Sequence, residues 1–186
     1  MARISKSKSR KGAEMIEFTL ALLPLLMMIF VLMDASWGMF AKSTLAYAVR
    51  TGLRVGITTT GTTASTAGTG GTALDLTTMV KQTVQANAPG MLKGAAGLAN
   101  IQVHYFHPPD VGSGAAPTDV STVNPAGPVS PGDIMQVSVQ GFSLRPLVGR
   151  IFGLRSGVDA SSTPMSAVAS DLIEPSRDPP VKGTAP

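Results

Sequence analysis

Apolar residues are spread unevenly along this chain, and their longest uninterrupted run lies near the N-terminus. Residues 18–33 carry no charge, and after Asp34 the chain stays uncharged as far as Ala41. A transmembrane helix needs about 20 apolar residues, and the ring of Trp37 suits the headgroup boundary. The pattern therefore predicts one membrane-spanning helix, kinked at Pro24 because proline cannot donate the backbone hydrogen bond of an interior helical position.

The distribution of cations predicts the orientation of this helix. Five Lys or Arg residues lie within the first 11 positions, with no acid among them. Segments rich in Lys and Arg stay in the cytoplasm, so we expect a cytoplasmic N-terminus and a periplasmic remainder. The expected membrane anchor consists of Phe18, Leu20, Leu22, Leu23, Pro24, Leu25, Leu26, Met27, Met28, Ile29, Phe30, Val31, Leu32, Met33 and Trp37.

The helical pattern continues beyond the membrane. Polar and small residues recur every fourth position, at Lys42, Ala46, Arg50 and Arg54. An apolar row follows a different face, at Phe40, Leu45, Val49 and Leu53. A helix over residues 13–55 would be roughly 60 Å long, at about 1.5 Å per residue, which is twice the thickness of the hydrocarbon core. We expect the excess to form a stalk that stops at Gly52 or Gly56.

Residues 56–73 mark a change in composition. The stretch holds 8 Thr and 5 Gly among 18 residues, which is typical of a linker. A small outer domain is expected over residues 74–174, beginning with a helix whose apolar positions run from Leu74 to Ala88 and whose N-cap is Asp75.

Three segments of the outer domain have the composition of strands. They are residues 100–106, residues 133–140 and residues 163–173. The second alternates apolar and polar residues, and a bulge at Gly141 would let Phe142 and Leu144 resume the inner face. Residues 108–132 are rich in proline and predict a long mobile loop, and residues 175–186 predict a disordered tail. The expected fold class is therefore α+β: a long transmembrane and stalk helix, then one helix and an antiparallel sheet of about three strands.

Composition limits the kinds of partner and activity expected of the outer domain. After the leader, 10 basic residues face 11 acidic ones, and aromatic residues make up only 5% of the chain. A nucleic-acid binder would spread its cations through the folded part, so no nucleic acid is expected as a partner. His104, His107 and Asp110 follow one another at intervals of three, which places neighbours on opposite faces of a strand. We therefore expect no metal, no cofactor and no enzyme activity, because no catalytic motif accompanies them.

Two carboxylates, Glu14 and Glu17, stand directly before the apolar run. Acids in the first turn of a helix gain about 0.3–1 kcal/mol each from the helix dipole, which is one explanation for both. However, an acid placed in the membrane costs about 2.5–3.5 kcal/mol and usually has a partner. Dipole matching alone therefore leaves their position unexplained.

The N-terminal stretch resembles the signal of type IV pilin-like proteins: a basic leader ending at Gly12, then Ala13, Glu14, Glu17 and an apolar run. That resemblance implies cleavage by a prepilin peptidase between Gly12 and Ala13, which makes residues 1–12 a leader. Glu17 would become the fifth mature residue, where it could neutralise the α-amino group of a neighbouring Ala13. Glu14 would be the more dispensable acid.

Within this group the chain is most similar to TadE-like proteins, the pilin-like minor components of the tight-adherence (Tad/Flp) pilus system. The similarity rests on "RKGAEMIEFTLALLPLLMMIF" (10–30), on "AKSTLAYAVRTGLRVG" (41–56) and loosely on "GDIMQVSVQGFSLRPL" (132–147). It implies a structural protein of the bacterial inner membrane that supports pilus biogenesis and surface adhesion. Its partners would be other pilin-like subunits, the prepilin peptidase, the assembly platform and the lipid bilayer. The alternative is an uncleaved, membrane-anchored periplasmic interaction module.

Overall fold

The computed structural model describes residues 10–61, 74–124, 127–144, 163–175 and 178–183. The chain divides into two compact units, and each is described by itself. The first contains Met1–Met39 and Arg145–Thr163, and the second contains Phe40–Leu144 and Pro164–Pro186. Most of the leader and most of the Thr/Gly-rich segment lie outside the described residues.

The N-terminal helix α1 is a single element, Arg10–Thr58, with Pro24 inside it. The prediction of a long N-terminal helix is confirmed, but the expected stop at Gly52 or Gly56 is wrong, because the helix passes through both glycines. Gly52 and Gly56 are buried, and they allow α1 to pack closely against other elements rather than ending it.

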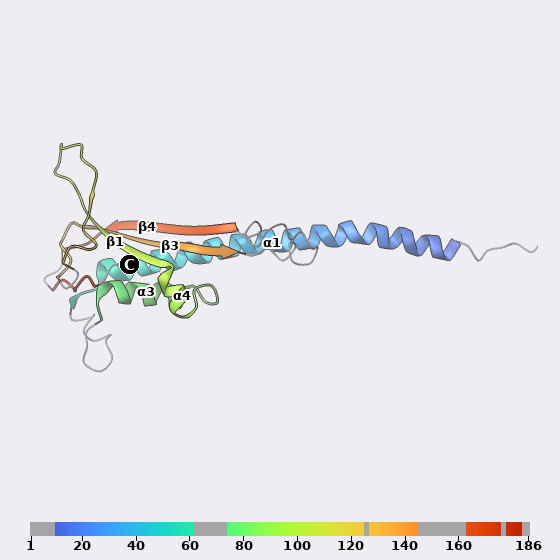
Figure 1. Ribbon diagram of the computed structural model, residues 1–186, viewed down its shortest axis with the longest axis horizontal. Helices are drawn as coiled ribbons and strands as arrows, with labels where there is room; N and C mark the ends of the chain where they lie inside the picture. Colours follow the sequence, from blue (N-terminus) through green and yellow to red (C-terminus); the bar gives the residue numbers. More distant parts are fainter. Residues whose placement is uncertain (1–9, 62–73, 125–126, 145–162, 176–177, 184–186) are drawn as a thin grey trace, which may run out of the picture. The chain divides into compact units, whose positions relative to one another are not determined.

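The second unit is an α+β structure, in which a sheet lies over the later part of α1 and over α3 (Figure 1). The elements after α1 are α3 (Leu76–Asn87), α4 (Gly94–Ala99), β1 (Ile101–His107), β2 (Thr118–Asp119), β3 (Ile134–Leu144) and β4 (Thr163–Leu172). The strand order is β2-β1-β3-β4, and β1 runs antiparallel to both β2 and β3. The predicted fold class is confirmed, with four strands in place of about three.

Burial along β3 follows the predicted alternation. Met135, Val137 and Val139 are buried, and they pair in register with Tyr105, Val103 and Ile101 of β1, which are buried too. At Gly141 the backbone φ is +74°, a value that favours glycine. Beyond it Phe142 and Leu144 turn back to the inner face, half-buried and buried respectively, as the sequence predicted.

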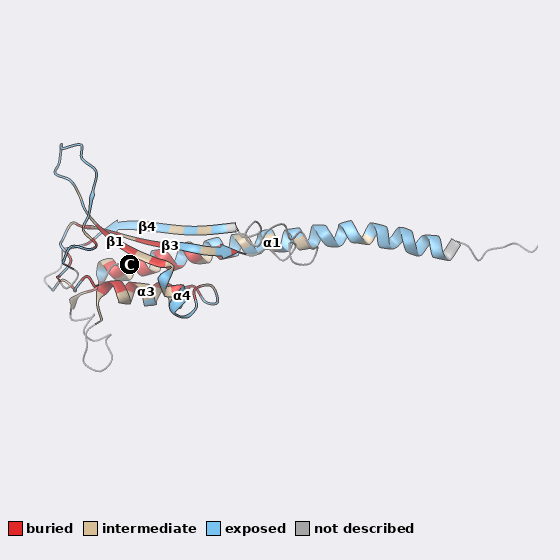
Figure 2. Ribbon diagram, viewed as in Figure 1, coloured by how far each residue is buried: buried red, intermediate tan, exposed pale blue. Residues whose placement is uncertain are grey.

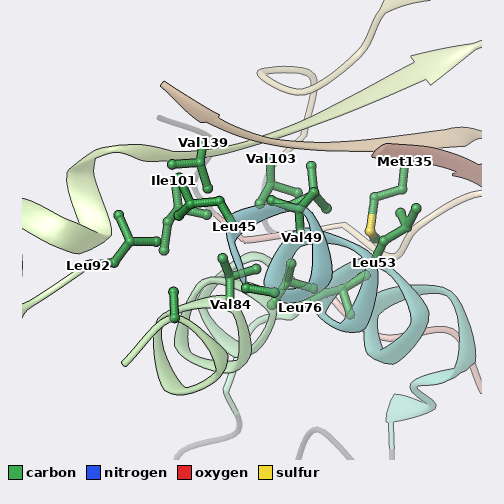
Figure 3. Close-up of a cluster of buried hydrophobic side chains, with 14 of the residues drawn as sticks. Leu45, Val49, Leu53, Leu76, Val84, Leu92, Ile101, Val103, Met135 and Val139 are labelled. Atoms are coloured by element: carbon green, nitrogen blue, oxygen red, sulfur yellow. The ribbon is translucent and has the colours of Figure 1, made fainter. Parts of the chain in front are cut away.

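One apolar core joins the helices to the sheet (Figure 3). Its buried members are Leu45, Ala48, Val49, Leu53, Leu76, Val80, Val84, Ala88, Leu92, Ile101, Val103, Tyr105, Val129, Met135, Val137, Val139 and Ile173. The first four belong to α1. The segment predicted as a stalk therefore supplies one wall of the outer-domain core over residues 45–53.

Helix α3 begins as predicted. Asp75 is its N-cap, and the Asp75 carboxylate accepts a hydrogen bond of 3.0 Å from the backbone N–H of Thr78. Helix α4 was not predicted, because its sequence GAAGLA is short and rich in glycine. Its buried residue is Gly97, where a side chain would collide with the backbone of Leu92.

Parts of the Pro-rich loop and of the C-terminal tail are joined to the rest of the second unit by backbone hydrogen bonds, and the mobility of the loop and the disorder of the tail stay predictions. Within residues 108–132, the N–H of Val120 donates to the Tyr105 carbonyl at 2.8 Å, and Pro128 forms a β-bridge with Val181. The N–H groups of Leu76 and Thr77 donate to the carbonyls of Val181 and Lys182, at 2.9 and 3.0 Å. Residues 178–183 therefore form a clasp over the start of α3, held by backbone hydrogen bonds.

Candidate functional site

The first part of α1 is exposed along most of its length (Figure 2), and most of its large side chains are apolar. All the residues predicted to face lipid are exposed except Leu22 and Phe30, which are half-buried. Exposure of this many large apolar side chains is expected of a helix whose surroundings are not water. Within the described residues, α1 is the one helix long and apolar enough to cross a membrane. It fits a membrane anchor.

Polar groups inside the apolar part of α1 are satisfied within the helix. The hydroxyl of Thr19 donates to the carbonyls of Met15 and Ile16, at 3.0 and 2.9 Å. The hydroxyl of Ser36 donates to the Leu32 carbonyl at 2.8 Å. Because unsatisfied polar groups are costly in lipid, these bonds make both residues compatible with a membrane.

Packing gives no reason for a small residue at the predicted processing site. Gly12 and Ala13 are exposed, and a Cβ added at Gly12 would meet no atom within 4 Å. This differs from Gly52 and Gly97, where a side chain would collide with neighbouring atoms. The glycine is therefore not required by contacts among the described residues, and cleavage after Gly12 stays a prediction.

Glu14 and Glu17 are exposed and lie three residues apart, so they share one side of the helix. Because α1 begins at Arg10, its first turn contains no acid. The influence of the helix dipole falls off within that turn. In the uncleaved chain, dipole matching therefore accounts poorly for Glu17, which lies a full turn beyond the first.

The part of α1 that follows the anchor is held by close helix packing. A Cβ added at Gly52 would collide with Cγ2 of Val84, and one at Gly56 would lie 2.5 Å from the sulfur of Met135. Larger residues at these positions would separate α1 from α3 and from the sheet. The Ala48, Gly52 and Gly56 positions thus form a row of small residues that lets the helix enter the core.

The two histidines do not act as one cluster. His104 lies 3.3 Å from the Asp119 carboxylate, and His107 lies 2.8 Å from the Asp133 carboxylate. The hydrogen bonds from Ser121 hold the pKa of Asp119 below its usual value, and His104 lowers it further. Each histidine joins neighbouring segments of the sheet region. Across the described part of the chain, no three His, Cys, Asp or Glu residues gather as metal ligands would.

A buried polar network lies where the tail clasp meets the sheet. The hydroxyl of Thr77 donates to the Lys182 carbonyl at 2.6 Å and lies 3.1 Å from the Tyr105 hydroxyl. Burial raises the pKa of Tyr105 to about 12, because the phenolate would lose its hydration, although the bond to Thr77 opposes this. No local pattern along the chain predicts this network, since Thr77 and Lys182 are 105 positions apart.

Comparison with known proteins finds a family similarity for the N-terminal part of the chain. No curated protein and no solved structure matched. The family model described as TadE-like protein matches residues 12–54. That range begins at the predicted processing site, contains the whole apolar anchor and ends at the last turn of α1. The resemblance to TadE-like proteins predicted from the sequence is thereby confirmed over residues 12–54.

Proposed function

We propose that this chain is a membrane-anchored, pilin-like structural component of Tad/Flp pilus biogenesis that supports surface adhesion and has no catalytic activity of its own. The observation that carries the proposal is the TadE-like match over residues 12–54. That range includes both the exposed apolar helix and the core-packed residues Leu45, Val49 and Leu53. The matched segment is thus an anchor and a structural part of the outer domain at once.

In this proposal the helix sits in the bacterial inner membrane, with its N-terminus in the cytoplasm and residues 57–186 in the periplasm. The five leader cations support this orientation. A reporter that is active only in the cytoplasm, fused after Pro186, should be silent. Strong reporter activity would reverse the orientation.

A prepilin peptidase then removes residues 1–12 and frees the α-amino group of Ala13. The Glu17 carboxylate of an adjacent subunit pairs with that amino group, and the attraction is strong because the surroundings are apolar. Other pilin-like subunits and the assembly platform are the further partners. The exposed position of Gly12, Ala13 and Glu17 on α1 is compatible with these contacts.

The deciding experiment combines processing with assembly. In a strain that makes the pilus, intact-mass analysis should give a mature chain beginning at Ala13. Glu17→Gln should leave insertion and cleavage intact but reduce surface pili and co-purification with partner pilins. Glu14→Gln is the matched control and should have a mild effect. Full-length protein, together with normal pili from Glu17→Gln, would identify the chain as an uncleaved, anchored interaction module.

A further inference from the structure

One face of α1 within the second unit is left uncovered. Tyr47, Arg50 and Arg54 are all exposed, with Tyr47 at 62%. At 3.6 residues per turn, Tyr47 lies about 160° around the helix axis from both Leu45 and Val49, which are buried in the core. Spacings of three, four and seven residues place the three side chains on one surface, which we name the helix face.

Among the residues that the structure describes, the two arginines of the helix face have no acidic partner. The ion pairs among the described residues involve His104 and His107, and neither Arg50 nor Arg54 takes part in one. Tyrosine and arginine are the residues most enriched at the energetic centres of protein interfaces. An exposed tyrosine flanked by two unpaired arginines therefore suits a partner that presents carboxylates.

The same unit presents carboxylates at one end of its sheet. The N–H of Ile173 donates to the Asp133 carbonyl at 2.8 Å, and the Asp133 carboxylate bonds to His107. The ends of β4 and β1 therefore meet at Asp133, the residue before β3. We name Asp110, Asp171 and Glu174, which follow or end these strands and are exposed, the acidic end.

The helix face and the acidic end carry opposite charges. The exposed or half-buried lysines and arginines among the described residues of this unit lie on α1, on α3 or directly before α4: Lys42, Arg50, Arg54, Lys81 and Lys93. The exposed carboxylates of the acidic end, in contrast, lie in or after the strands, and exposed Asp178 lies beside Gly61, just after the end of α1. One surface of the molecule is thus complementary to a different surface of an identical molecule, whereas either surface would repel itself.

We propose that the helix face of one copy binds the acidic end of a second copy. The inference rests on the proposed function, because it supplies a contact by which outer domains associate during pilus assembly. The contact is heterologous: each copy offers the helix face to one neighbour and the acidic end to another. Contacts of this kind extend into open filaments unless the rotation closes a ring, so the geometry suits a fibre subunit.

Cysteine cross-linking in the full-length chain tests the contact directly, since the chain has no cysteine of its own. Two differently tagged copies are co-expressed in the pilus-forming strain, one with Tyr47→Cys and the other with Glu174→Cys. Mild oxidation of membranes and pili should give a disulfide-linked dimer containing both tags. Each variant alone should give none, and a chain with both cysteines should give a ladder of multimers. Dimers from Tyr47→Cys alone, or no mixed dimer, would overturn the proposal.

Charge reversal provides the second arm. For this test the cysteines are placed at Tyr47 and Asp110. The double change Arg50→Glu and Arg54→Glu should abolish the cross-link. The double change Asp171→Lys and Glu174→Lys should abolish it too. Combining both reversals in one chain should restore it, because the charges are again complementary. All four side chains are exposed, so protease resistance of the outer domain should be unchanged. No restoration in a protease-resistant chain would refute the contact.

The cross-linking experiments and the tests of the proposed function can fail independently of each other. Cleavage after Gly12 and dependence of piliation on Glu17, without any cross-link, would leave the pilin-like role standing and remove this contact alone. A full-length chain with normal pili from Glu17→Gln and no cross-link would remove both. A mixed cross-link from an uncleaved chain would retain the contact as self-association of the outer domains.

Discussion

Both parts of α1 carry large apolar side chains, but those side chains have opposite surroundings. From Phe18 to Met33 the large side chains are mostly exposed, and from Ala41 to Leu53 the apolar positions of one face are buried. The first part exposes most of its large apolar side chains and fits lipid as its solvent. The second part is amphipathic, with small residues where neighbours approach and cations on the outside.

The comparison shows that hydrophobicity alone does not reveal what a helix is packed against. What separates the two parts is the angular distribution of the apolar residues and the position of glycine. Exposed apolar residues surround the helix axis in the first part, whereas Leu45, Val49 and Leu53 form a stripe in the second. The TadE-like match covers both parts.

Truncation of one leucine in each part of α1 should give the largest difference in outer-domain stability. Leu45 is 1% exposed and Leu23 is 65% exposed. Leu45→Ala should lower the unfolding free energy of the outer domain by about 2–5 kcal/mol, because it loses burial and leaves a cavity. Leu23→Ala should leave that stability unchanged. Urea titration of the detergent-solubilised chain, followed by proteolysis of the outer domain, measures both. Equal losses would contradict the distinction.

Glycine substitutions sharpen the same comparison with a somewhat smaller effect. Gly52→Leu should destabilise the outer domain by about 1–3 kcal/mol through overpacking, because even a Cβ there collides with Val84. Gly12→Leu should leave the domain stability unchanged, since nothing lies within 4 Å, and should instead block removal of the leader. Intact mass and urea titration of both variants separate the two roles. A destabilised Gly12→Leu chain would show that Gly12 has a packing role.

Features with a local signal could be predicted from the sequence. The apolar run, the Asp75 cap and the alternation around Met135 are set by neighbouring residues, so the anchor, α3 and β3 were expected near their observed bounds. The phase change at Gly141 was also predictable, because an interrupted alternation requires an extra residue. The predicted site residues Gly12, Ala13, Glu14 and Glu17 came from a motif, and the structure places them on one exposed stretch of helix.

Features that depend on distant partners could not be predicted. Gly52 and Gly56 can end a helix or permit close packing, and the choice depends on Val80, Val84 and Met135, which follow much later in the chain. The two-residue strand β2 exists because β1 offers it hydrogen bonds. The tail clasp is rich in proline, as disordered tails are, yet its carbonyls accept hydrogen bonds from the start of α3.

The two tyrosines provide a comparison of how stability depends on pH. The unfolding free energy should change by up to about 2.5 kcal/mol. Tyr47 is exposed on α1, whereas burial raises the pKa of Tyr105 to about 12 from 10.0. A raised pKa means that the folded state keeps its proton longer than the unfolded state. The stabilisation is therefore complete below pH 10 and is lost as the pH rises from about 10 to 12, at up to about 1.4 kcal/mol per pH unit.

Urea titrations between pH 9 and 12 measure this loss. Tyr105→Phe should remove that part of the alkaline slope, whereas Tyr47→Phe should retain it, because it leaves the buried phenol in place. Identical slopes in the parent chain and in Tyr105→Phe would contradict the assignment of the buried phenol.

Threonine-to-valine changes give the finest test, because they keep the side-chain shape and remove only the hydroxyl. Thr77 is buried, and its hydroxyl donates to the Lys182 carbonyl and contacts the Tyr105 hydroxyl. Thr77→Val should cost the outer domain about 1–2 kcal/mol, since it leaves buried polar groups with fewer partners. It should also loosen the tail clasp, which makes residues 178–183 more accessible to carboxypeptidase.

Thr19→Val is the matched control in the anchor. The Thr19 hydroxyl bonds to carbonyls of the preceding turn, which already serve the helix, so its loss should change outer-domain stability by less than about 0.5 kcal/mol. Both variants are measured by urea titration of the detergent-solubilised chain. If Thr19→Val destabilised the outer domain as much as Thr77→Val, the anchor would be coupled to the core. The environments of the two parts of α1 would then no longer account for the difference between them.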